Sequence, residues 1–89
     1  MSRREWQKVL DSEVKRWSAM SCSELVSELR DDLQEYQVEF ESKPYNVEVE
    51  LLEDTEQYLH VVVAVDDGSL PASIRPESRT FIVRKGTAI

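Results

Sequence analysis

The chain holds one histidine and one cysteine, so any chemistry that needs an imidazole or a thiol must use His60 or Cys22. A carboxylate beside an imidazole can act as a general acid or base, and we expect Glu48 or Glu50 to lie opposite His60 across a hairpin. Neither a nucleophile nor a third orienting group stands beside His60 in the sequence, and Cys22 belongs to no C-x-x-C motif. The sequence therefore predicts no catalytic residue, and Cys22 is interpreted as a small apolar filler at a helix start.

Carboxylates are dense in the middle of the chain and raise the question of a metal site. Divalent cations such as Ca²⁺ prefer clustered oxygen ligands on a loop with a fixed turn. The acidic residues here recur every second position along expected strands, which places them in a row rather than a cage. They are Glu39, Glu41, Glu48 and Glu50, with Glu53, Asp54 and Glu56 nearby. Only two glycines are present, and no glycine-rich phosphate loop occurs. We expect neither a metal nor a cofactor.

The formal net charge of −7 is unevenly distributed. Residues 1–20 carry +2, residues 21–60 carry −10, and residues 61–89 carry +1. An acidic centre repels phosphate backbones, so nucleic-acid binding is not expected. The same charge keeps a small protein in solution, or it forms a surface complementary to a basic partner.

The elements that position these side chains follow from hydrophobic periodicity. Apolar and polar residues alternate over 35–41 and 44–52, which is typical of strands with one buried face. Residues 58–66 are apolar on both faces, which indicates a central strand, and 79–84 complete a set of four. The sequence places a turn at Ser42-Lys43, pairing Phe40 with Tyr45, and a second turn centred on Thr55, pairing Glu50 with His60. Residues 69–78 are expected to form a loop.

Two helices are expected before the strands, at about 2–18 and 22–30. Trp6, Leu10, Val14 and Trp17 recur at helical spacing and form one apolar stripe. Ser21 and Glu24 match a capping box at the start of the second helix. We predict a single α+β domain spanning 1–89, in which both helices pack on one face of a four-stranded antiparallel meander.

The face of the sheet opposite the helices is the predicted interaction surface. It would carry an apolar strip beside the glutamate row, and contiguous exposed apolar residues are typical of interfaces. The predicted interface consists of Tyr58, Val62, Ala64, Ile82, Glu48, Glu50 and His60. A homodimer through this strip or through an edge strand is one prediction, and a foreign protein partner is the other.

Three functions are compatible with these observations. The first is a non-catalytic protein-interaction domain with an acidic sheet face. The second is a small regulatory or antitoxin-like protein that occupies a basic site on its partner. The third is an enzyme that uses His60 with a nearby glutamate.

The segment from Tyr36 to Gly68, followed by Pro76 and by residues 78–85, resembles a group of short, uncharacterised bacterial proteins. The resemblance covers about two-thirds of the chain and implies no activity, cofactor or site residue. It implies a bacterial, cytoplasmic protein.

The single cysteine agrees with a reducing compartment. No signal peptide is expected, and the longest apolar run, Val61–Val65, is too short to cross a bilayer, so no membrane association is expected.

Overall fold

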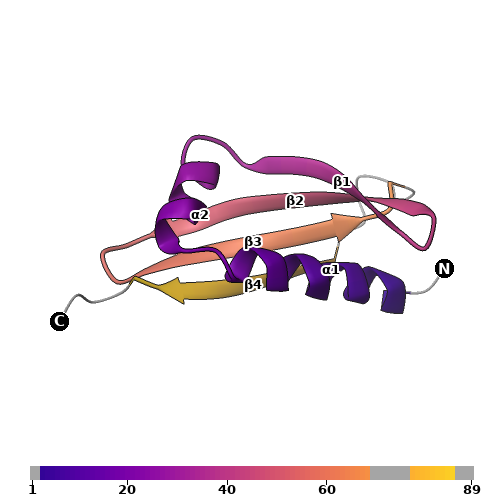
Figure 1. The fold of residues 1–89 in the computed structure, drawn as a ribbon, viewed down its shortest axis with the longest axis horizontal. Helices are drawn as coiled ribbons and strands as arrows, with labels where there is room; N and C mark the ends of the chain where they lie inside the picture. Colours follow the sequence, from indigo (N-terminus) through magenta and orange to yellow (C-terminus); the bar gives the residue numbers. More distant parts are fainter. Residues whose placement is uncertain (1–2, 69–76, 86–89) are drawn as a thin grey trace.

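A computed structural model describes residues 3–68 and 77–85. Two helices precede four strands, which form one antiparallel sheet in the order β1-β2-β3-β4 (Figure 1). The elements are α1 Arg3–Ser18, α2 Cys22–Leu29, β1 Gln34–Phe40, β2 Lys43–Asp54, β3 Tyr58–Asp66 and β4 Glu77–Arg84. Both helices lie on the same side of the sheet, α1 along β3 and β4 and α2 against β2. The predicted α+β architecture is confirmed.

The apolar stripe of α1 packs on the sheet as its spacing predicts. Trp6, Leu10 and Trp17 are buried, and Val14 packs at the margin of the core. Opposite them, the inward residues of β3 are completely buried; they are Leu59, Val61, Val63 and Val65. Each buried side chain of this size stabilises the fold by about 1.5–3 kcal/mol, so β3 and α1 form the centre of the core.

Helix α2 is short and depends on its cap and on one buried side. The Ser21 hydroxyl accepts a hydrogen bond from the Glu24 amide at 3.2 Å, and the Glu24 carboxylate accepts one from the Ser21 amide at 2.9 Å. This is the predicted capping box, which satisfies two amides that a helix start leaves without partners. The pKa of Glu24 is lowered mainly by the hydrogen bond from the Ser21 amide, and further by the Ser21 side chain. Leu25 and Leu29 are the buried anchors of the helix.

The hairpin between β1 and β2 differs from the predicted one. Its loop is Glu41-Ser42, with φ values of 52° and 66°, and Phe40 pairs with Lys43 instead of Tyr45. Two positive φ values in a two-residue loop match a type I′ turn, whose twist suits a hairpin. The predicted loop would have made Glu41 and Pro44 the closing hydrogen-bonded pair, and Pro44 has no N–H to donate. In the observed register Pro44 falls in a non-hydrogen-bonded pair with Glu39, so its missing amide costs no bond to β1.

The strand boundaries also differ from expectation, by one residue in β1 and at the start of β2 and by two residues at two further places. Strand β2 continues to Asp54, two residues past the predicted end, and β4 begins at Glu77, inside the segment expected to be a loop. Residues 69–76 of that expected loop lie outside the described part of the chain. Strand β3 spans the predicted residues and is central, with β2 and β4 on its two sides.

A partly buried hydrogen-bond network joins β1 to α1. The Trp17 indole N–H donates to the Tyr36 hydroxyl at 2.7 Å, and that hydroxyl donates to Glu13 Oε1 at 2.5 Å. Arg16 pairs with the same oxygen at 3.4 Å, and its guanidinium lies 5.5 Å from the centre of the Tyr36 ring. Burial, and then the bond to Glu13, raise the pKa of Tyr36 to about 12. Because only 7% of Glu13 is exposed, this carboxylate depends on these donors.

Candidate interaction face

The side of the sheet away from the helices forms a surface that we call the outer face. Strand alternation and the observed register assign its members, because residues directly opposite each other point to the same side. They are Glu35, Gln37 and Glu39 from β1; Pro44, Asn46, Glu48, Glu50 and Glu53 from β2; Tyr58, His60, Val62, Ala64 and Asp66 from β3; and Ser78, Thr80, Ile82 and Arg84 from β4. Six of these side chains are acidic, whereas Arg84 is the one arginine or lysine among them.

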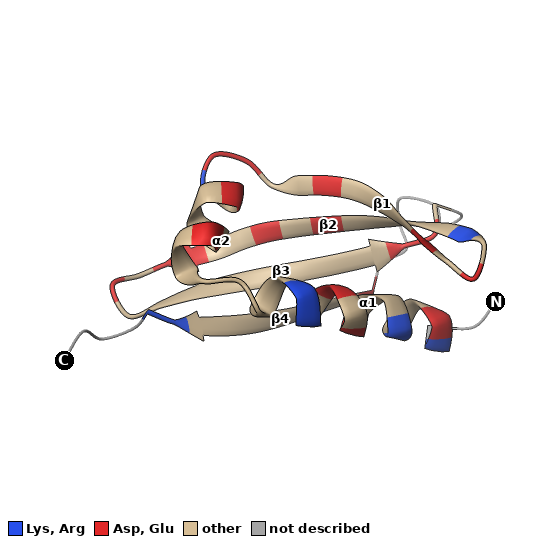
Figure 2. Ribbon diagram, in the orientation of Figure 1, with Lys and Arg blue, Asp and Glu red and all other residues tan. Residues whose placement is uncertain are grey.

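The acidic residues gather on the β1–β2 half of the outer face. Figure 2 shows red segments along β1 and β2, whereas most of β3 and β4 carries no charge. Glu35 lies directly opposite Glu48 in the ladder, and Glu50 follows on β2. Like charges that face each other across a strand pair are destabilising. This arrangement therefore reduces the stability of the sheet.

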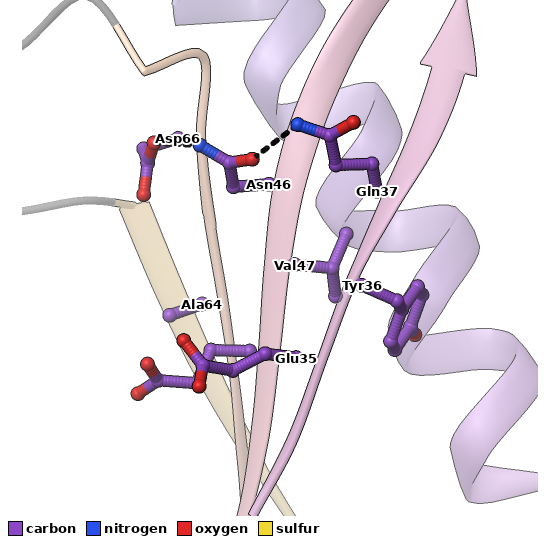
Figure 3. A pocket seen from close by; sticks show the side chains of 8 residues that line it. Glu35, Tyr36, Gln37, Asn46, Val47, Ala64 and Asp66 are labelled. Carbon is purple, nitrogen blue, oxygen red and sulfur yellow. Dashed lines mark hydrogen bonds between the residues drawn. The ribbon is translucent and has the colours of Figure 1, made fainter.

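A shallow hollow of about 370 Å³ lies within this acidic half (Figure 3). Ala64 lies opposite Glu48, and its short side chain leaves room between its larger neighbours. The lining residues are Glu35, Tyr36, Gln37, Asn46, Val47, Glu48, Ala64 and Asp66. Three of them are carboxylates, so the hollow is suited to a cationic group.

One rim of the hollow is held by a chain of hydrogen bonds across three strands. Gln37 donates to Asn46 Oδ1 at 3.0 Å, and Asn46 donates to Asp66 Oδ1 at 3.0 Å. The same carboxylate accepts a bond from the Gly68 amide at 2.8 Å, which ties it to the turn after β3. The chain fixes the position of Asp66, whereas Glu35 and Glu48 are exposed. The sequence pattern does not single out Gln37, Asn46 and Asp66, because their contacts depend on the cross-strand register.

The apolar half of the outer face consists of the predicted strip. Ile82 is 58% exposed, and Tyr58, Val62 and Ala64 are partly exposed along β3. His60 lies within the strip, directly opposite Ile82. The structure thus brings all seven predicted interface residues onto one surface, with the strip on β3–β4 and Glu48 and Glu50 beside it on β2.

The predicted partner of His60 is wrong. Glu50 lies opposite Val62, whereas His60 lies opposite Glu53, with its Nδ1 3.4 Å from Glu53 Oε1. Two local features cause the change. Thr55 closes the turn through a 2.9 Å bond from its amide to the Tyr58 carbonyl and so does not stand at its centre. The register then shifts again between Leu51 and Glu53, as a bulge with one extra residue produces.

The outer face thus contains one carboxylate–imidazole pair, Glu53 and His60, but it does not contain the thiol of Cys22. Glu53 also accepts a hydrogen bond from the Tyr58 hydroxyl at 3.3 Å. The negative charge of Glu53 is the main cause, and burial the second, of a raised pKa for Tyr58. Cys22 lies on the helix side of the sheet, with Sγ 3.5 Å from the Arg84 carbonyl oxygen. His60 and Cys22 are therefore on opposite faces and do not form a pair.

Within residues 3–68 and 77–85, no group of three or more His, Cys, Asp or Glu side chains is arranged to hold a metal ion. Of the helices in the same residues, none has the length and apolar character needed to span a membrane.

Comparison with known proteins finds no protein-family model, curated protein or solved structure that matches this chain. The predicted resemblance to short bacterial proteins therefore stays a prediction.

Proposed function

We propose that this protein is a small interaction domain whose outer face binds a basic surface of another protein. The observation that carries the proposal is the opposition of Glu35 and Glu48 on a sheet face that neither helix covers. Opposed like charges weaken a sheet, and departures from local stability rules are typical of functional sites. A partner that supplies cations here would relieve this repulsion on binding.

The rest of the face fits this use. An apolar strip beside a charged rim is the usual composition of a protein interface, in which apolar contacts supply affinity and charges supply selectivity. Asp66 is held in place by Asn46 and the Gly68 amide, so part of the acidic rim is already ordered before binding. The antitoxin-like function predicted from the sequence is one form of the same proposal, in which the basic surface is the active site of the partner.

The experiment compares two variants of equal net charge as baits for capture from cell extract. Glu48→Gln/Glu50→Gln removes two charges from the outer face. The control, Glu28→Gln/Asp31→Asn, removes two exposed charges from α2 and the following turn. We expect the wild type and the control to capture a partner with a basic contact surface. The face variant should capture at least tenfold less of that partner.

Salt provides the second arm, since exposed ion pairs weaken as ionic strength rises. Binding that survives Glu48→Gln/Glu50→Gln unchanged, or that does not respond to salt, would show that the acidic half of the outer face is not the binding surface.

A further inference from the structure

The sheet has two edge strands, and they differ in how well they are protected. The tight turn at Glu41-Ser42 makes Phe40 and Lys43 a hydrogen-bonded pair, and bonding alternates from there across the ladder. On β1 the backbone groups that face solvent therefore belong to Glu35, Gln37 and Glu39. Following the same alternation through β2 and β3, those on β4 belong to Ser78, Thr80 and Ile82, and to Arg84, whose carbonyl oxygen also lies 3.5 Å from Cys22 Sγ.

Strand β1 is protected against pairing with another chain, and β4 is not. Natural edge strands discourage pairing by carrying charged side chains. Two of the three edge-facing residues of β1 are glutamates, whereas β4 presents the uncharged run Thr80–Val83 between Arg79 and Arg84. Its residue Ile82 is the most exposed large hydrophobic side chain in the described part of the chain. β-Branched and aromatic residues such as these also favour strand pairing.

We propose that β4 pairs antiparallel with β4 of a second copy of this chain, which joins the two sheets into one of eight strands. The edge-facing groups must bond to each other. With Phe81 opposite its own counterpart at the two-fold axis, Thr80 lies opposite Ile82 of the second copy and this requirement is met. The same register sets Glu77 opposite Lys85, whose ammonium group pairs with Asp54 in its own chain. Centring on Thr80 instead would place Glu77 opposite Val83 and lose this charge match.

Charge placement allows a second copy at this edge despite the net charge of −7. With strands about 4.8 Å apart, the two β2 strands of the dimer are five spacings, or about 24 Å, from each other. That separation exceeds the Debye length of about 8 Å at physiological salt, so repulsion between the acidic halves is largely screened. At the edge itself, Arg79 is paired with Asp11 and Lys85 with Asp54 at 2.6 Å, so these two positive charges are neutralised within each chain.

The helices leave room for the pairing. An ion pair joins Arg79 to Asp11, and Tyr36 contacts α1 from the β1 side, so the helix lies between these two contacts over β3 and β4. If each α1 is centred between β3 and β4, the two α1 axes in the dimer are about 10 Å apart. This is an ordinary distance for packed helices.

Sedimentation of the wild-type chain over a range of concentrations tests the proposal, with an expected mass of twice 10.3 kDa at the upper end. Thr80→Pro removes an edge-facing amide of β4 without removing a bond to β3, and should yield a monomer that is still folded by circular dichroism. Glu39→Pro makes the same change at the β1 edge and should remain a dimer. A wild type that stays monomeric at its highest soluble concentration overturns the proposal, and so does a Thr80→Pro variant that remains a dimer.

Cysteine scanning in a Cys22→Ser background tests the register. Directly opposite residues in a non-hydrogen-bonded antiparallel pair have Cα atoms about 4.5 Å apart, within the range that a disulfide can span. Phe81→Cys should therefore oxidise to a covalent dimer, whereas Arg79→Cys and Val83→Cys should not, because each lies about 14 Å from its counterpart. Cross-linking at 79 or 83 in place of 81 refutes the proposed pairing.

Discussion

Replacing Tyr36 with phenylalanine removes one oxygen atom from the centre of the partly buried network between α1 and β1. That oxygen donates to the Glu13 carboxylate at 2.5 Å and accepts from the Trp17 indole at 2.7 Å. A hydrogen bond to a charged group contributes about 1.5–3 kcal/mol and a neutral one about 0.5–1.5 kcal/mol. Arg16 remains 3.4 Å from Glu13 and offsets part of the loss. We therefore expect the free energy of unfolding to fall by about 2–4 kcal/mol.

Urea denaturation at pH 7, followed by tryptophan fluorescence, measures this change. The matched control is Tyr58→Phe, which removes the same atom from a hydroxyl bonded to the exposed Glu53. Little change is expected there, because solvent replaces the lost partner. A loss below about 1 kcal/mol for Tyr36→Phe, with an unchanged denaturant slope, would refute the argument that Glu13 depends on the Tyr36 hydroxyl.

The same variant has a signature at alkaline pH. Burial, and then Glu13, raise the pKa of Tyr36 to about 12, above the usual value near 10. The folded state thus favours the protonated phenol, whose contribution is fully present below pH 10 and is lost as the pH rises through 12. The wild type should lose stability over this window, and Tyr36→Phe should lose less. Part of the decline should remain in the variant, because burial, and then Glu5, also raise the pKa of Tyr45.

Three further changes test the core, the cap and the outer face. Leu25→Ala truncates a completely buried side chain of α2 and should lower the free energy of unfolding by about 2–5 kcal/mol, measured by urea titration; a loss under 1 kcal/mol would mean that α2 does not anchor the core. Ser21→Ala removes the cap hydroxyl and should cost about 1 kcal/mol in the same assay, while an unchanged midpoint would contradict the role of the capping box. Glu48→Lys replaces the repulsion with Glu35 by attraction. It should raise the free energy of unfolding by about 0.2–1 kcal/mol while weakening partner capture. A destabilised Glu48→Lys variant would count against the cost assigned to the opposed glutamates.

The periodicity of the sequence is enough to predict which elements form and which sides of them are buried. A period of two over β1 and β2 and a helical period over α1 sort apolar side chains to one side, whatever the rest of the chain does. Trp17 is buried and the outward residues Glu48 and Val62 share one face, as expected. These features depend on local geometry alone.

Register and buried polar contacts were decided by the tertiary structure. A hairpin can shift by two residues and keep every side chain on its expected face, so alternation could not distinguish Phe40 opposite Tyr45 from Phe40 opposite Lys43. The turn closed by Thr55 and the bulge before Glu53 together move the partner of His60 from Glu50 to Glu53, and both depend on contacts between β2 and β3.

Glu13 illustrates the same limit in the core. A glutamate among exposed charges on a helix is expected in solvent, yet it is buried because Tyr36, 23 residues away, supplies a donor. The sequence by itself determined the layers of this protein and the composition of its outer face, because these follow from spacing along one element. Only the tertiary structure decided which carboxylate meets which donor, because each such contact joins atoms from different strands and helices.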